Sequence, residues 1–244
     1  MNSARASASD ELISRWRQVL IEMRRASAMA GHEAETVKLL AVSKFQAAEA
    51  IAALNDAGQR DFGENYVQEA LEKMQQLRGR DICWHLIGPL QSNKTAEVAA
   101  NFDWVHSVDR LKIARRLNDQ RPDELPPLNI CLQVNIDDED SKSGCSLAEL
   151  PTLVEAIMEL PRLRLRGLMV IPKAGETSAF ATLAKTHAAI LARLPRLADA
   201  PFDSLSMGMS ADLAEAIAAG STWVRIGTAI FGARPTISSV GTTA

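Results

Sequence analysis

Strand-like and helix-like segments alternate along almost the whole chain. Short apolar runs that suit buried strands occur eight times, and segments with helical spacing of apolar residues lie between them. The expected strands are 37–44, 61–65, 83–88, 104–108, 128–136, 165–171, 204–208 and 222–226. This alternation predicts parallel strands connected by crossover helices.

Eight such units in 244 residues favour an α/β fold consisting of a single closed (β/α)8 barrel of the TIM type. The alternative is an open doubly wound sheet, but no G-x-G-x-x-G follows the first strand. An extra helix is predicted over 10–30, where Leu12, Trp16 and Val19 recur at helical spacing. No linker-like stretch interrupts 10–235, so we expect one domain there, with flexible ends over 1–9 and 236–244.

Composition excludes several classes of protein. The net charge of −3 and a pI near 5.9 give no basic footprint for nucleic acid. No apolar run approaches the ~18 residues of a membrane-spanning helix, and the N-terminus lacks the apolar core of a secretion signal. Cys83, Cys131 and Cys145 form no zinc or disulfide pattern, and the histidines show no H-E-x-x-H. We therefore expect a cytoplasmic protein with reduced thiols, no membrane contact and no metal site.

The first predicted strand closes on Lys44. Side chains alternate along a strand, so Leu40, Val42 and Lys44 share one face. If that face points into the barrel, the amine lies over the interior at the carboxyl end of the strand. Burial favours a free amine, which can form an imine with an aldehyde. The alternative is a solvated lysine where a strand meets a loop.

Small, turn-permissive segments follow the last two predicted strands. Gly208 and Ser210 follow the seventh strand, and Gly227 and Thr228 follow the eighth. Gly208 permits a tight turn, and Ser210 suits the N-cap of the next helix, whose free N–H groups attract anions. Barrels of this type often bind phosphate after strands 7 and 8, so these segments together predict a phosphate site. Taken singly, Ser210 is better explained as a helix cap and Gly227 as a turn.

Arg225 precedes Gly227 by two residues, and its side chain should therefore point inward at the end of the last strand. Lys44, the phosphate segments and Arg225 suit either pyridoxal 5'-phosphate (PLP) or the phosphosugar of a cofactor-free aldolase. Beside a pyridine nitrogen, a permanent cation would keep that nitrogen unprotonated. The alternative is a buried ion pair between Arg225 and a carboxylate such as Glu64.

Longer motifs extend from about residue 10 to 235. They are AVSK at 41–44, FGENY at 62–66, WHLIGPLQSNK at 84–94, HSVD at 106–109, QVNI at 133–136, SKSG at 141–144, GLM at 167–169, SMGMSAD at 206–212 and VRIGTAIFG at 224–232. Together these motifs closely resemble the PLP homeostasis protein family, whose barrel is similar to the N-terminal domain of alanine racemase.

The resemblance implies a cofactor and the residues that hold it. Lys44 would carry PLP as an internal aldimine. Ser210, Gly227 and Thr228 would contact its phosphate, and Arg225 would lie near the pyridine nitrogen.

Three further residues enter the predicted cofactor site through the same resemblance. Asn65 and His85 would lie near the ring, and Met207 belongs to the same set of contacts. Considered without the resemblance, strand histidines such as His85 and His106 are more often hydrogen-bonded core residues than catalysts.

The resemblance also implies a function, namely a protein that buffers or delivers PLP without catalytic turnover. Racemases of the related fold add a β-rich domain with a tyrosine that acts as second acid/base across a dimer. Here nothing of domain size follows Gly232, and Tyr66 is the only tyrosine. We therefore expect a solvent-open pocket, a monomer, and PLP-dependent apoenzymes as partners. The alternatives are a weak amino-acid racemase that uses Lys44 as its base and a phosphosugar aldolase.

Overall fold

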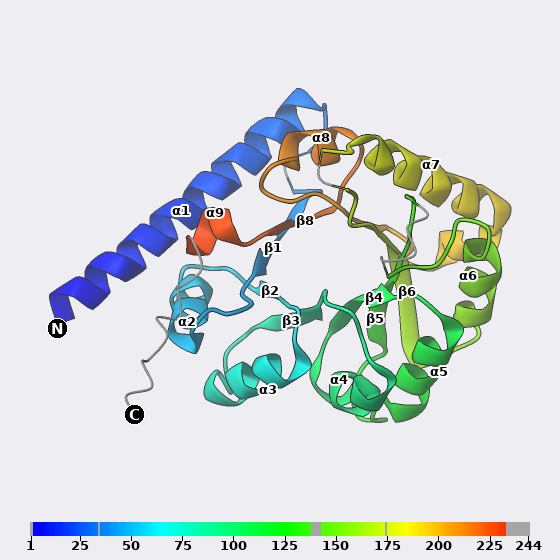
Figure 1. Ribbon diagram of the computed structural model, residues 1–244, viewed down its shortest axis with the longest axis horizontal. Helices are drawn as coiled ribbons and strands as arrows, with labels where there is room; N and C mark the ends of the chain where they lie inside the picture. The colour runs from blue at the N-terminus through cyan, green and yellow to red at the C-terminus, as the bar shows by residue number, and fades with distance from the viewer. Residues whose placement is uncertain (1, 34, 138–142, 174, 233–244) are drawn as a thin grey trace, which may run out of the picture.

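The computed structural model describes residues 2–33, 35–137, 143–173 and 175–232. Within these residues, eight parallel strands close into a barrel in sequence order, and helices surround it (Figure 1). The strands are β1 Lys38–Val42, β2 Asp61–Glu64, β3 Cys83–Leu86, β4 Trp104–Val108, β5 Leu128–Gln133, β6 Leu163–Met169, β7 Ser204–Ser206 and β8 Trp223–Ile226. The helices are α1 Asn2–Met29, α2 Ala48–Asp56, α3 Val67–Gln76, η1 Ser92–Lys94, α4 Thr95–Asn101, α5 Leu111–Gln120, α6 Leu150–Met158, α7 Ser178–Arg193, η2 Pro195–Asp199, α8 Leu213–Ala218 and α9 Thr228–Phe231.

The barrel closes where β1 pairs with β8. Leu40 lies opposite Arg225 across this seam, and on its other side β1 pairs with β2 through Val42 and Gly63. The closed order of eight parallel strands confirms the predicted TIM-type barrel and excludes the open sheet.

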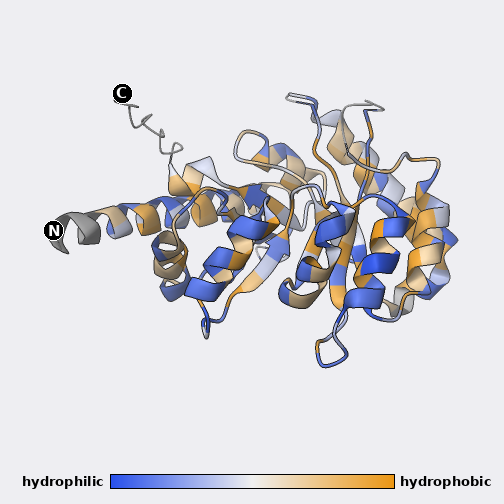
Figure 2. Ribbon diagram, turned by 60° about the horizontal axis from the view of Figure 1, so that its bottom comes forward, coloured by the Kyte–Doolittle hydropathy of each residue, from blue (hydrophilic) through white to orange (hydrophobic). Residues whose placement is uncertain are grey.

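Apolar side chains form two separate layers. The outer layer lies between the strands and the helices and contains fully buried residues such as Phe62, Phe102 and Phe180. The inner layer fills the barrel and consists of Leu40, Ile87, Trp104, Cys131, Met169 and Trp223. Hydrophobic residues accordingly alternate with hydrophilic ones along the surrounding helices (Figure 2).

The leading helix α1 packs along the barrel seam beside α8 and α9 (Figure 1). Trp16 donates its indole N–H to Gln59 Oε1 at 2.9 Å, and Arg15 Nε donates to the carbonyl of Ile230 at 2.8 Å. The helix begins at Asn2, so residues 2–9 are helical where the sequence predicts a flexible end. The predicted tail 236–244 lies outside the described residues.

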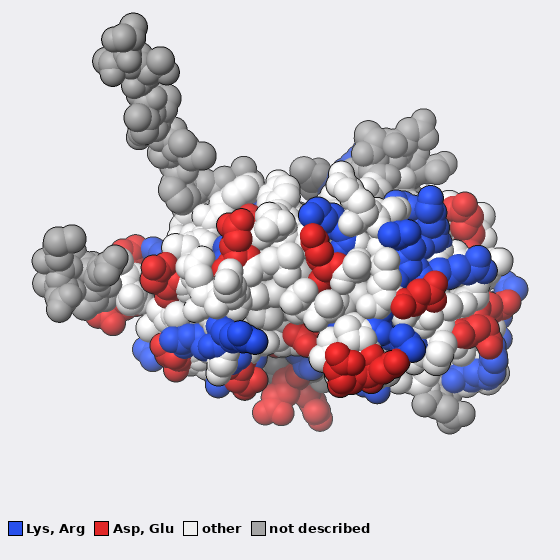
Figure 3. All heavy atoms as spheres, turned by 90° about the horizontal axis from the view of Figure 1, so that it is seen from below, with Lys and Arg blue, Asp and Glu red and all other residues white. Residues whose placement is uncertain are grey.

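The surface shows no single sign of charge on the face in Figure 3, where basic and acidic side chains are interspersed. Among the described residues, none of the helices combines the length and the hydropathy needed to cross a membrane. All three cysteines are free, and burial raises the pKa of Cys131 and Cys145 to about 12. Their thiols are therefore neutral, as predicted for reduced core cysteines.

Candidate functional site at the carboxyl end of the barrel

Lys44 lies two residues beyond the end of β1, in the turn that leads to α2. Leu40 belongs to the inner layer and Val42 packs against it, so the face that these residues share with Lys44 is the inner face, as predicted. Lys44 is half-buried, and within the described part of the chain its amine has no hydrogen-bond or ion-pair partner. The amine is therefore available at the barrel mouth.

A buried ion pair anchors the backbone just before Lys44. The ammonium of Lys73 donates to the carbonyl of Ser43 at 2.7 Å, to Glu64 Oε1 at 2.8 Å and to Glu69 Oε1 at 2.6 Å. The hydroxyl of Ser43 also donates to Glu64 Oε1, at 2.6 Å. Burial raises the pKa of the Glu64 carboxyl, and the nearby Lys73 ammonium opposes that rise. Lys73 thus connects the end of β1, the end of β2 and helix α3.

The same cluster anchors the backbone just after Lys44. The amide of Phe45 donates to Glu69 Oε1. Phe45 has a φ of 64°, which is unusual for a residue with a side chain. Anchoring on both sides fixes where the Lys44 side chain leaves the chain.

Asn65 lines a cavity of about 210 Å³ beside the end of β2, together with Ile87, Gly88 and Gln133. Its Oδ1 is buried and has no hydrogen-bond partner among the described residues. A Cβ at Gly88 would lie 2.1 Å from the carbonyl oxygen of Asn65, so only glycine fits there. Asn65 follows β2, the neighbour of β1, whereas Ile87 and Gly88 follow β3 and Gln133 ends β5, so the cavity lies at the carboxyl ends of these strands.

Gly227 and Thr228 lie on the other side of Lys44, after β8. A Cβ at Gly227 would lie 3.3 Å from the carbonyl oxygen of Val42, which places this glycine against the end of β1. The amides of Ile230 and Phe231 donate to the carbonyl of Gly227. Thr228 therefore lies in the first turn of α9, where amide N–H groups have no acceptor within the helix. Thr228 is exposed, and its amide and hydroxyl suit an anion.

The prediction that Ser210 caps the helix after β7 is wrong. Asp212 is the N-cap residue of α8, so the helix starts two residues later than a cap at Ser210 would place it. The Asp212 carboxylate accepts a hydrogen bond from the amide of Met209. Ser210 lies exposed in the preceding turn, which begins at Gly208 with a φ of 93°. Met207 is fully buried in the outer layer, so its side chain packs away from the barrel interior.

Arg225 points into the barrel, as predicted. Its Nη1 donates to Ser206 Oγ at 2.9 Å, and its Nη2 donates to the carbonyl of Val170 at 2.8 Å. These two bonds use part of the five-donor capacity of a guanidinium group. Burial lowers the pKa of Arg225 to about 10. The alternative ion pair with Glu64 is wrong, because that carboxylate pairs with Lys73.

His85 and His106 lie side by side within the barrel and are fully buried. His85 Nδ1 is 2.9 Å from His106 Nε2, and His85 Nε2 is 3.0 Å from Asp61 Oδ1. His106 Nδ1 is 2.8 Å from Ser206 Oγ. Burial lowers the pKa of both imidazoles. The interpretation of both histidines as hydrogen-bonded core residues is confirmed, and the position of His85 near a cofactor ring stays a prediction.

Asp61, Cys83 and His85 bring three potential metal-ligating atoms within 4.8 Å of one another at the amino end of the barrel. The Cys83 sulfur lies 3.3 Å from His85 Nε2. Burial raises the pKa of the Cys83 thiol, and the Asp61 carboxylate adds to this rise. Hydrogen-bond contacts between these three side chains account for the arrangement.

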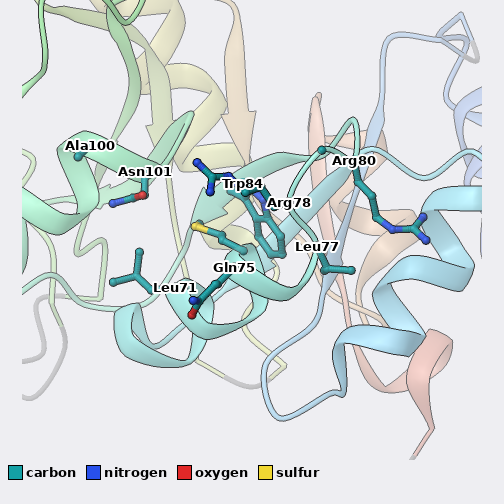
Figure 4. Close-up of a pocket in the computed structure, with 10 residues that line it drawn as sticks. Leu71, Gln75, Leu77, Arg78, Arg80, Trp84, Ala100 and Asn101 are labelled. Carbon is teal, nitrogen blue, oxygen red and sulfur yellow. The ribbon is translucent and has the colours of Figure 1, made fainter.

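A separate pocket of about 430 Å³ opens on the outer surface between α3 and α4 (Figure 4). Trp84 and Arg78 lie at its centre, and Arg80 extends away from them toward α2, where it donates to Asp56. None of its lining residues belongs to the predicted cofactor site.

Comparison with known proteins decides the family. A family model described as the N-terminal domain of alanine racemase matches residues 22–235. The pyridoxal phosphate homeostasis protein of Pseudomonas aeruginosa is 56% identical over 220 residues, which cover 89% of this chain and 93% of that protein. The chain belongs to the pyridoxal phosphate homeostasis protein family. The homeostasis protein of Escherichia coli strain K12 is 54% identical over 225 residues and is covered to 94%.

Solved structures agree with this family. PipY of Synechococcus elongatus, a structure with PLP bound, has a TM-score of 0.77 and 35% identity, and the match covers 91% of this chain and all of PipY. The alanine racemase of Corynebacterium glutamicum has a TM-score of 0.66 at 16% identity, covering 94% of this chain and 63% of the racemase. The racemase likeness shows the shared barrel fold.

Proposed function

We propose that this member of the PLP homeostasis family binds PLP through Lys44 and buffers or delivers it without catalytic turnover. The observation that carries the proposal is the unpartnered Lys44 amine at the barrel mouth. Two strands pair with β1: Gly227 follows β8 on one side, and Asn65 follows β2 on the other side. An aldehyde placed there would meet an available amine.

The residues around the mouth fit the chemistry of this cofactor. PLP supplies an aldehyde that an amine can bond covalently, and it carries a phosphate. Thr228, Gly227 and the exposed turn at Ser210 offer donors for the phosphate on the β7 and β8 side. Arg225 keeps guanidinium donors for a ring nitrogen, and Asn65 presents a buried acceptor without a partner in the described chain. The backbone of Met207 leads into the same phosphate-binding turn.

The absence of turnover is supported by the surroundings of the only tyrosine. A racemase needs a second acid/base on the opposite face of the substrate. Tyr66 is exposed at the start of α3, and its ring packs on Phe45 with centroids 5.3 Å apart. We extend the proposal to a cytoplasmic monomer that hands PLP to PLP-dependent apoenzymes, because a cofactor held in an exposed mouth can be released.

Borohydride reduction of the PLP-loaded protein tests the proposal. We expect the reduced protein to carry one pyridoxyl group on the peptide that contains Lys44, located by mass spectrometry. Lys44→Ala should abolish both the covalent adduct and the colour of the bound cofactor, because Lys44 supplies the inner-face amine at this end of β1.

Lys38→Ala is the matched control. Lys38 lies on the same strand at its amino end, where its ammonium is 5.1 Å from the centre of the Trp223 ring. This variant should keep the adduct on Lys44. An adduct on Lys38, or full labelling of Lys44→Ala, would contradict the assignment.

The weak racemase is the second candidate, because Tyr66 directly follows Asn65 in the sequence and its ring packs on Phe45, the residue after Lys44; its exposure to water argues against this role. Proton exchange at the α-carbon of alanine in heavy water separates the two functions. We expect the loaded protein to exchange this proton no faster than free PLP does, and Tyr66→Phe to leave that rate unchanged. Exchange that is faster than free PLP and lost in Tyr66→Phe would establish an enzyme.

A further inference from the structure

Five polar side chains from five strands form a continuous chain across the barrel interior. They are Asp61 on β2, His85 on β3, His106 on β4, Ser206 on β7 and Arg225 on β8. Asp61 opens β2 at the amino end, whereas Ser206 closes β7 at the carboxyl end. The chain therefore runs from the bottom of the barrel to the proposed cofactor mouth.

The two ends of the chain fix the direction of every hydrogen bond. A guanidinium only donates, so Ser206 Oγ accepts from Arg225. At the other end the Asp61 carboxylate only accepts, so a neutral His85 accepts at Nδ1 and a neutral His106 accepts the Ser206 hydroxyl proton at Nδ1. A neutral His106 then carries its proton on Nε2 and donates it to His85 Nδ1. His85 in turn donates from Nε2 to the Asp61 carboxylate.

This order leaves no place for a further proton on either imidazole. Each ring has one donor and one acceptor nitrogen, and both are used. Burial favours the neutral form of both rings. The chain is polarised from a cation at one end to an anion at the other, which strengthens each bond within it.

Two indoles shield the chain from water. Trp104 stacks on His85 with centroids 5.4 Å apart, and Trp223 contacts both histidine rings at 5.0 and 6.1 Å. At the amino end the guanidinium of Arg166 covers the Trp104 ring at 4.7 Å. Hydrogen bonds in such an apolar sheath hold their geometry more strongly than in water.

We infer that Asp61, His85, His106 and Ser206 are positioning residues that hold Arg225 at the mouth as a donor toward the cofactor ring nitrogen. This inference rests on the proposed function, because it assigns a role to Arg225 in PLP binding. It also gives His85 a role in cofactor binding that acts through other residues rather than by contact.

The first experiment tests the chain in the protein without PLP. Nitrogen-15 NMR of the imidazoles should show both His85 and His106 as Nε2–H tautomers between about pH 6 and 8. An Nδ1–H tautomer, an imidazolium or a metal on His85 Nε2 would overturn the chain. The outcome does not depend on whether the protein binds PLP.

The second experiment measures PLP affinity. Ser206→Ala removes one of the two anchors of Arg225, and we expect about tenfold weaker binding of PLP. The pH dependence of the absorption of bound PLP should also shift, because the donor at the ring nitrogen is displaced. Ser204→Ala is the matched control: it is a buried serine on the same face of β7, bonded to Asp203 instead of the chain.

Asp61 provides a second pair of variants at the far end. Its side chain is 27% exposed, so substitution there is compatible with folding. Asp61→Asn keeps an acceptor for His85 and should bind PLP more tightly than Asp61→Ala. Wild-type affinity and spectra in both Ser206→Ala and Asp61→Ala would overturn the positioning role, whereas a wild-type protein that binds no PLP would overturn the proposed function and leave the tautomers unchanged.

Discussion

Single residues near the barrel mouth fix the position of Lys44, the amine that we propose binds the cofactor. Lys73 is almost fully buried, and it compensates the fully buried Glu64 while bonding to the carbonyl that precedes Lys44. Lys73→Met would leave that carboxylate without a partner, and we expect a loss of about 3–5 kcal/mol in the free energy of unfolding. Urea denaturation measures it.

Two further variants make this measurement specific. Glu64→Gln in the Lys73→Met background should recover part of the loss, because the buried charge is then absent. Lys94→Met removes a partly exposed ion pair with Glu97 and should cost less than about 1 kcal/mol. Equal losses for Lys73→Met and Lys94→Met would show that the cluster around Glu64 is not a stabilising anchor.

At the scale of elements, the sequence predicts the barrel well because periodicity reports which faces are buried. The strand expected over 83–88 is β3 Cys83–Leu86, and the helix expected to follow Ser210 is α8 Leu213–Ala218. The start of α8 was misplaced because Asp212, rather than Ser210, supplies the capping position. Two residues of a polar turn compete for that role, and spacing alone does not separate them.

In the candidate site, the sequence predicted only the direction of side chains on the strands or just beyond their ends. The alternation rule places Lys44 and Arg225 on inner faces, and the structure agrees. The partners of Arg225 were not predicted, because Ser206 and the Val170 carbonyl reach it from the ends of other strands. Local sequence patterns do not show which side chains of different strands meet. They show only that residues two apart, such as Ser206 and Gly208, share one face of a strand.

For the whole molecule, the buried histidine pair predicts an acid limit to stability. The folded-state pKa of His85 and His106 is lowered, so the unfolded chain binds more protons once the pH falls below about 6.5. Stability should therefore decrease as the pH falls through that value, by up to about 1.4 kcal/mol per pH unit for each histidine.

Urea unfolding curves between about pH 7.5 and 5.5 measure this dependence. The raised pKa of Glu64 acts in the opposite direction, since a folded state that binds its proton more tightly gains stability as the pH falls. Curves recorded for Glu64→Gln should therefore show a steeper acid loss than the wild type. Stability that stays constant in both proteins would contradict neutral histidines within the barrel.

The seam between β1 and β8 joins the first strand of the barrel to the last one. During translation, Lys44 leaves the ribosome long before Arg225 and Gly227 exist to stand beside it. A nascent chain thus exposes its reactive amine without the groups that would retain the anionic end of a ligand. If Lys44 binds PLP as we propose, loading with PLP follows ring closure, and a complete barrel is the condition for capture.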